Sequence, residues 1–388
     1  MSVDVVRMRF AAVAAKIETT PGTDAIATTP ANTDWIAADC EMEFDPVTVE
    51  NPELTGSLDK APAIVGGMRP RIRLRVPLRG SGSPGTPPEW GKLLRCCTYQ
   101  ETITATAVGV PTAALGGTAN TLTLAVHFVG TAQAYRGMPM QLTGDRVLTT
   151  GITDYTAGRV ATLGETMATA GGVSTLTQVP INVLYGPTSD ESIYKTATIY
   201  FYADGLRWRF TGALGSWSLE LSTGGIGFLV FDLRAQFLDK TATAIPTGWN
   251  TAIRQTPPRF VGGRCQLNGS LARARRLMLD AGISVILPDN PEAAEGYDPA
   301  IPAERDSRGS IDPLMSSTSS VALFNAFRLG TPMPLMAVIG SVAGNRFILT
   351  APAAKATGLR PGAREGLGQL DIAFQLDGAD SDLFLAQF

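Results

Sequence analysis

The side chains that most often carry enzyme chemistry are sparse in this sequence. Its single histidine, His127, lies in an alternating segment that predicts a strand, and no nucleophile-elbow motif is present to pair with it. Carboxylates are scattered over loop-like segments without a repeated pair, and the glycine-rich stretches lack the Lys-Ser/Thr of a phosphate-binding loop. We therefore predict no catalytic residues, and we expect His127 to be structural.

Four cysteines, Cys40, Cys96, Cys97 and Cys265, lack the spacing typical of metal ligands. We expect structural thiols in a reducing compartment, with no metal and no cofactor. No apolar run reaches the roughly 18 residues of a membrane-spanning helix, so we expect no membrane anchor.

Arginines alternate with apolar residues in the segment 69–78. Arg71, Arg73 and Arg75 fall on one face of a predicted strand, and Ile72 and Leu74 fall on the other. A nucleic-acid site would add interleaved aromatic residues and a basic charge balance, whereas the formal net charge is −3. The arginines therefore predict a solvated strand face or one that meets another subunit.

Two segments far apart in the chain repeat one pattern. Gly225–Phe237 reads GIGFLVFDLRAQF and Gly366–Leu376 reads GLGQLDIAFQL, and apolar residues recur at every second position in both. That period is typical of a strand with one buried face. Because such a strand cannot bury its apolar face alone, the repeated pattern predicts two similar β units.

A predicted helix precedes each copy of the repeated strand. The first opens at Thr86-Pro-Pro-Glu89, which has the spacing of a capping box, and continues through Trp90 to Cys97. The second follows Ser316–Ser320 and carries Phe324 and Phe327 on one face. The predicted order of strands, helix and strands therefore occurs twice.

The sequence predicts a mainly β protein, and its composition divides the chain into several parts. Short strands separated by glycine-rich turns predict a small all-β module inserted into the first unit, and Phe44–Gly67 and Pro288–Ser310 predict long acidic loops. The predicted boundaries are a first domain at 1–105 and 191–240, the inserted module at 106–190, a linker at 241–263 and a second domain at 264–388.

Three segments resemble the tail tube (major tail) proteins of bacteriophages with long, non-contractile tails, the siphovirus type. They are KIETTPGTD near the N-terminus, GSGSPGTPPEWGKLLRCC before and within the first helix, and ATIYFYADGLRWRFTGALGSWSLELSTGGIGFLVFDL. The resemblance covers residues 9–105 and 191–238 and, more weakly, 264–388. The inserted module has no counterpart in it.

The resemblance implies a fold and a role. It implies two tandem tail-tube-like β-sandwich domains, each with a flanking helix, in a virion structural protein made in the host cytoplasm. Rings of this protein would stack into a tube through which DNA passes transiently from capsid to host, and a tape measure protein and a tail terminator would be partners. A duplicated chain would need only three copies for a pseudo-hexameric ring.

Two sets of residues follow as candidate sites. The long acidic loop and the N-terminal arm would bridge stacked rings, and the inserted module would decorate the outside and be dispensable for polymerisation. The candidate inter-ring contacts are Val47, Val49, Pro52, Leu54 and Leu58. A neutral or acidic hydrophilic channel would let DNA slide, and the candidate lumen-lining residues are Ser218, Glu220, Asp232, Gln369, Asp371 and Gln375.

Two other classes of protein remain open from the sequence. A β-sandwich module that binds carbohydrate, or an adhesin, would expose clustered aromatic residues, for which Tyr194, Tyr200 and Tyr202 are the candidates. A hydrolase would depend on His127 or on one carboxylate.

Overall fold

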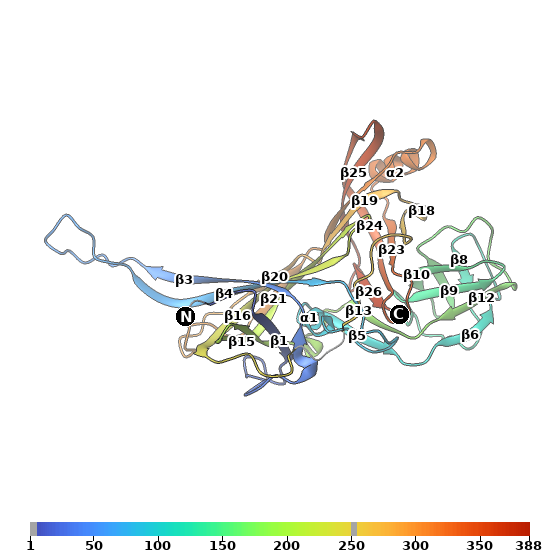
Figure 1. Ribbon diagram of the computed structural model, residues 1–388. Coiled ribbons are helices and arrows are strands. Elements are labelled where there is room, and N and C mark those ends of the chain that lie inside the picture. The colour runs from blue at the N-terminus through green and yellow to red at the C-terminus, as the bar shows by residue number, and fades with distance from the viewer. Residues whose placement is uncertain (1–5, 250–253) are drawn as a thin grey trace.

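The computed structural model describes residues 6–249 and 254–388, and β-strands dominate it (Figure 1), which confirms the predicted mainly β class. Residues 1–5 of the predicted N-terminal arm and 250–253 of the predicted linker lie outside the described residues. Within the described part, no helix has both the length and the apolar character needed to cross a bilayer.

The central feature is a row of antiparallel strands that we call the long sheet. Among the described residues, eight strands lie side by side in it. In spatial order they are β3 (Asp39–Val49), β4 (Ile64–Pro77), β16 (Phe228–Ala242), β15 (Leu206–Ser222), β19 (Ala274–Asp280), β22 (Arg308–Pro313), β25 (Leu367–Leu376) and β24 (Phe347–Arg364).

The long sheet contains the predicted repeat. Its first four strands and its last four have the same order and connections, and β16 and β25 carry the echoed segments. The two halves meet where β15 pairs with β19, from Ser218 opposite Asp280 to Ser222 opposite Arg276. The duplication seen in one strand therefore extends to a four-stranded unit.

Smaller strands extend both halves in the same way. In the first half β15 continues to β14 (Ala197–Ala203), β1 (Ala11–Ile17) and β2 (Trp35–Ile36). In the second half β24 continues to β23 (Met333–Ile339), β17 (Arg264–Leu267) and β18 (Ser270–Leu271). On its other edge β24 pairs with β26 (Phe384–Gln387), which leads to β13 (Asn182–Pro187) and β5 (Tyr99–Thr104).

One core fills the space behind the long sheet. Trp217, Phe231 and Leu279 project into it from both halves and are at most 1% exposed. Trp90 packs against Tyr185 and against Phe347 of β24, with ring centroids 5.5 and 6.1 Å apart. The two repeats therefore share buried side chains, and large aromatic groups supply much of the apolar area that leaves water.

Two tight connections explain local order in this core. Asp204-Gly205 stands between two alternating segments, which predicts a hairpin, and the hairpin forms between β14 and β15. Gly205 adopts its φ of 94° at no steric cost, and Asp204, at φ 38°, is of a residue type that tolerates positive φ. In the helix α2 (Ser317–Leu329), the Ser316 hydroxyl accepts a hydrogen bond from the Ser319 N–H, and Gly330 ends the helix at φ 64°.

Both predicted helices form, but with differences. α1 (Gly91–Arg95) starts after the predicted capping box, because Glu89 instead pairs with Arg79 and Arg254. In α2 the buried residues are Leu323 and Ala326, whereas Phe324 is 52% exposed. Short 3₁₀ turns also form at Asn32–Asp34 and Glu191–Ile193.

The inserted module has its own seven-stranded sheet within the described residues. In order, its strands are β6 (Val108–Ala113), β12 (Thr175–Val179), β9 (Pro139–Gly144), β10 (Leu148–Tyr155), β11 (Val160–Leu163), β8 (Thr121–Thr123) and β7 (Gly116–Gly117). The predicted range 106–190 therefore includes β13, a strand that pairs outside the module.

The module shares a core with the second repeat. Module residues such as Met140, Ile152 and Tyr155 pack in one cluster with Met336 of β23 and Ile348 of β24. Arg264 of β17 also pairs with the buried Glu165 of the module, whose pKa burial raises. Removing the module would expose this apolar surface to water, which argues against our expectation that it is dispensable.

The predicted long loop 44–67 is largely a β-ribbon. β3 and β4 pair as far as Val49 opposite Ile64, so only residues 50–63 connect them at the tip, and Figure 1 shows the ribbon projecting far from the body. In the second repeat the equivalent excursion folds back as β20 (Ile283–Ile286) and β21 (Ile301–Arg305). The sequence alternation hid this pairing, because Pro46 and the glycines at 66 and 67 interrupt it.

Candidate functional site: a charged face of the long sheet

The long sheet has two chemically different faces. On β4, Ile72, Leu74 and Val76 are fully buried, whereas the side chains of Arg71 and Arg73 are 42% and 55% exposed. The cross-strand register keeps this alternation in step along the whole row, so apolar residues share one face and polar residues the other. We call the exposed side the polar face.

One row of residues shows the continuity of the polar face. Cross-strand pairing links neighbouring members without interruption from the first strand to the last. In order the row is Asp39, Arg75, Val230, Ser218, Asp280, Arg308, Gln375 and Lys355.

All six candidate lumen residues lie on the polar face. Ser218 and Glu220 are on β15, Asp232 is on β16, and Gln369, Asp371 and Gln375 are on β25. The Gln375 amide donates to Asp306 Oδ1 at 2.8 Å, and the Gln369 amide donates to Asp371 Oδ1. That these residues line a channel stays a prediction.

Acidic partners surround the arginines of this face. Arg71 donates from Nε to Asp232 Oδ1 at 2.7 Å and makes a second bond to Oδ2, and this pairing raises the Arg71 pKa. Arg73 lies 3.7 Å from Glu41, and Arg75 lies 3.9 Å from Glu220. The Arg75 guanidinium also stacks 3.6 Å from the centroid of the Phe228 ring. Arg71, Arg73 and Arg75 therefore carry little unpaired positive charge, whereas Arg234 of β16, on the same face, makes no ion pair within the described residues.

Sequence reasoning missed part of the polar face. It did not assign Arg276, Asp280 and Arg308 of β19 and β22, nor Lys355 and Arg360 of β24, which the register places on the same side. The alternation of Arg276, Met278 and Asp280 was the available signal, but the strand is short and carries a bulge where it pairs with β22. The face is thus mixed in charge rather than simply neutral or acidic.

The candidate inter-ring contacts lie on the projecting ribbon. Leu54 and Leu58 at its tip are fully exposed, Val49 is 55% exposed, Pro52 is exposed and Val47 is half-buried. Sequence reasoning missed Ile64 and Val65 of β4, which are 58% and 65% exposed. Exposed apolar residues gathered on one projection are typical of a contact surface.

The second repeat supports the base of this ribbon. The Met68 N–H donates to Glu295 Oε2 at 3.1 Å, and the Arg69 guanidinium lies 5.8 Å from the Tyr297 ring centroid. A Cβ at Gly67 would lie 1.8 Å from the Glu295 carbonyl oxygen, so only glycine fits there.

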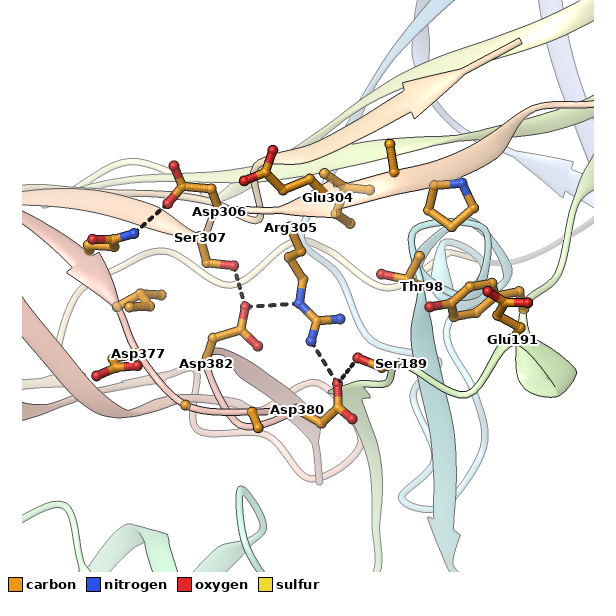
Figure 2. Close-up of a pocket in the computed structure, with 18 residues that line it drawn as sticks. Thr98, Ser189, Glu191, Glu304, Arg305, Asp306, Ser307, Asp377, Asp380 and Asp382 are labelled. Carbon is orange, nitrogen blue, oxygen red and sulfur yellow. Dashed lines mark hydrogen bonds and ion pairs between the residues drawn. The ribbon is translucent and has the colours of Figure 1, made fainter. Parts of the chain in front are cut away.

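An acidic cavity of about 520 Å³ lies where both repeats and the C-terminal segment meet (Figure 2). Arg305 crosses it, with a nitrogen 2.8 Å from Asp380 and another 3.4 Å from the buried Asp382. The Arg305 guanidinium also donates to the Thr188 carbonyl at 3.2 Å, and the Ser307 hydroxyl donates to Asp382. The cluster joins β21, the segment after β13 and the loop before β26.

The remaining residues with reactive side chains are the histidine and the four cysteines. His127 is exposed in a turn after β8, not in the predicted strand, since β8 ends at Thr123. Cys96, Cys97 and Cys265 are buried and Cys40 is half-buried, and all four are free thiols. Among the described residues, no three His, Cys, Asp or Glu side chains form a group that could hold a metal ion.

The aromatic residues do not form an exposed platform. Tyr200 and Tyr202 are fully buried and Tyr194 is half-buried. Tyr200 donates to Asp24 and packs on Tyr202, with ring centroids 6.3 Å apart. This packing removes the feature on which the carbohydrate-binding alternative rested.

We predict that Arg305→Met lowers the free energy of unfolding by about 3–5 kcal/mol, because Asp382 would stay buried without its cation. Chemical denaturation of the unassembled chain measures this change. Arg308→Met is the control, because the Arg308 side chain is 70% exposed and pairs with Asp306 in solvent, and about 1 kcal/mol or less is expected there. Equal losses in the two variants would contradict the prediction.

The comparisons with known proteins agree with this geometry. No curated protein matches the sequence. A family model described as "Phage tail tube protein" matches residues 11–376, which include both repeats and the inserted module. Its members are structural proteins of the tail tube, so the match implies self-assembly into a tube and a place in the virion tail. The chain belongs to the phage tail tube protein family.

Proposed function

We propose that this protein forms rings of three chains that stack into the tail tube, with the polar face lining a channel for DNA. The observation that carries the proposal is the long sheet, which has a buried face and a polar face. Among the described residues, β3 at one end and residues 360–364 of β24 at the other also have one edge without a backbone partner. Open edges expose unpaired backbone groups, and closure of the sheet into a barrel removes them. We also propose a tape measure protein and a tail terminator as partners of the tube.

The size of the sheet favours three copies. Three long sheets would supply 24 strands, and strands about 4.8 Å apart and tilted by about 40° give a barrel about 48 Å across between backbones. Six full chains would double that diameter. The two repeats of each chain then supply the pseudo-six-fold character.

The charge pattern of the polar face suits passage rather than retention of DNA. A lining of free arginines would replace the counterions of DNA and hold it. On this face Arg71, Arg73 and Arg75 instead have carboxylates within 4 Å. The lining would therefore be hydrophilic without being strongly basic.

The single ring should contain three chains of 40.9 kDa, about 123 kDa in total. Native mass spectrometry of rings released from tubes, or mass photometry, measures this directly. A ring of six full chains would refute the trimeric assembly.

Deleting residues 48–64 should give soluble protein that forms no tubes. The deletion removes the exposed apolar tip with Leu54 and Leu58 and the adjoining ends of β3 and β4, but it leaves the pairing of β3 with β4 from Asp39 to Pro46 in place. Circular dichroism checks the fold, and negative-stain images check the assembly. The matched control, Leu54→Ser with Leu58→Ser, retains the ribbon and should weaken stacking only in part. If the deletion variant formed tubes of normal length, the ribbon would not be needed for the contact between rings.

Glu220→Lys should slow DNA ejection without preventing assembly. Glu220 lies on β15, in the middle of the long sheet, so neither edge is disturbed. The change adds two positive charges and also leaves Arg75 without its nearest carboxylate. Ejection rates from virions carrying the variant are compared at low and high salt, since salt screens the added attraction. Glu220→Gln adds one charge and should have a smaller effect. Equal rates in all three proteins would exclude this lumen position.

A further inference from the structure

Each end of the long sheet has an open strand edge. Among the described residues, β3 pairs only with β4, so its other edge has no backbone partner. At the far end, β24 from Arg360 to Arg364 pairs only with β25. Residues 360–363 of that stretch are exposed, as are Asp39, Glu41 and Glu43 of β3.

The repeat supplies a template for joining these edges. Within one chain, the last strand of the first unit, β15, pairs with the first strand of the second unit, β19. The last strand of the second unit is β24, and the first strand of the first unit is β3. In a ring, β24 of one copy would therefore meet β3 of the next in the way that β15 meets β19.

The equivalent residues follow from the cross-strand register. Aligning the repeated segments from Gly225 and Gly366 places Phe231 of β16 at the same position as Ile372 of β25. Their partners on one side, Trp217 and Leu359, are then equivalent. On the other side, Phe231 pairs with Leu74, which in turn pairs with Cys40 of β3. Ile372 likewise pairs with Ile311, which pairs with Leu277 of β19. Cys40 and Leu277 are therefore equivalent.

This alignment fixes the register of the join. Since Leu221 faces Leu277 in the internal junction, Ala363 takes the place of Leu221 and Cys40 takes the place of Leu277. We propose that β24 of one copy pairs with β3 of the next with Arg360 opposite Glu43, Gly362 opposite Glu41, Ala363 opposite Cys40 and Arg364 opposite Asp39. This inference rests on the proposed ring, and we call the join the seam.

The charges of the two edges are complementary. Over the stretch that the seam would pair, the polar face of β3 carries only carboxylates, and the polar face of β24 carries only two arginines and a glycine. The β3 residues are Asp39, Glu41 and Glu43, and the β24 residues are Arg360, Gly362 and Arg364. Opposite charges directly across an antiparallel pair are favourable and like charges are not.

Two of these charges lack a partner in the single chain. Within the described residues, neither Asp39 nor Arg360 makes an ion pair. Arg364 of β24 pairs with Asp312 at 2.9 Å, and Arg71 and Arg75 of β4 pair with Asp232 and Glu220. The seam register supplies the carboxylate of Glu43 for Arg360, and it places Asp39 opposite Arg364, which would then lie between Asp39 and Asp312. Gly362 has no side chain, which leaves room for Glu41 between the two arginines.

The other face of the seam is compatible with the core. Cys40 and Met42 are half-buried and would continue the apolar face beyond β3, opposite Ala363 and Pro361. Pro361 has no N–H and so removes one donor from this edge. Proline is tolerated on edge strands, where it discourages indiscriminate pairing.

The native thiol of Cys40 allows a direct test by Ala363→Cys. Directly opposed residues of an antiparallel pair have Cα atoms about 4.5–5.5 Å apart, within the range of a disulfide. Burial raises the pKa of Cys40 to about 12, so assembled tubes are oxidised with copper phenanthroline. The expected product on a non-reducing gel is a covalent trimer with its dimer intermediate.

Three controls fix the register and the identity of the bond. The Gly362→Cys side chain points to the opposite face of the sheet and should not cross-link to Cys40. Pro361→Cys would cross-link to Cys40 only if the register of the seam were shifted by two residues. Adding Cys40→Ser to Ala363→Cys should abolish the product. Cross-linking that is stronger in Pro361→Cys or Gly362→Cys than in Ala363→Cys overturns the register.

A charge reversal provides a second, independent measurement. Arg360→Glu should reduce ring formation by about 100-fold, since a loss of about fivefold at each of three seams compounds, and Glu43→Arg in the same chain should restore it. Lys355→Glu is the matched control, because Lys355 carries the same charge on the same strand outside the paired stretch. Failure of the double variant to recover would overturn the Arg360–Glu43 pairing.

The two proposals fail in different ways. If the wild-type chain forms no rings, the proposed function is wrong. If it forms rings of three chains but Ala363→Cys gives no cross-link and Arg360→Glu assembles normally, only the seam register is wrong.

Discussion

The structure depends on the backbone pairing between β15 and β19. That pairing runs from Ser218 opposite Asp280 to Ser222 opposite Arg276, and it makes one sheet from two repeats. Side chains alternate strictly along a strand, so a slip of one residue here would turn one half's apolar residues to solvent. The apolar pairs Leu219–Leu279 and Leu221–Leu277 within the junction penalise such a slip, because all four are buried. The common polar face exists because this register holds.

The core behind the sheet stabilises the same arrangement from its other side. The Trp90 ring packs against Tyr185 and Phe347. Tyr185 belongs to β13, which follows the inserted module, and Phe347 belongs to β24 of the second repeat. Two ion pairs of Arg305, one with the exposed Asp380 and one with the buried Asp382, connect the folded-back excursion of the second repeat to the C-terminal segment. Buried pairs of this kind contribute little net stability when intact, but the loss of one partner is costly. They therefore fix which segments meet more than they strengthen the fold.

The two repeats differ in the segment that connects their first two strands. In the first repeat β3 and β4 extend into the projecting ribbon, and in the second the chain folds back as β20 and β21. Glu295 and Tyr297, from the loop between β20 and β21, contact the base of the ribbon. A ring with pseudo-six-fold walls would thus carry three ribbons, so its walls and its stacking contacts would differ in symmetry.

The sequence by itself determined the features that depend on local pattern. The period of two in Gly225–Phe237 and Gly366–Leu376 predicted two strands with one buried face, and the motifs before them predicted both helices and the Asp204-Gly205 hairpin. These follow from side-chain alternation and turn chemistry, which act between near neighbours. The placement of Glu220, Asp232 and Asp371 on one face also followed from alternation, but only strand by strand.

Tertiary structure decided what depends on pairing between distant segments. The neighbours of β3 and β24, the position of β13 outside the module and the core shared by the module with Met336 and Ile348 all arise from contacts across long stretches of chain. The partners of Arg71 and Arg75 were equally hidden, because Asp232 and Glu220 lie far along the chain and meet them only once the strands align. A strand's alternation states which side chains share its face. It does not state which strand lies beside it, because backbone hydrogen bonds are the same for every sequence and the choice is made by packing of the whole core.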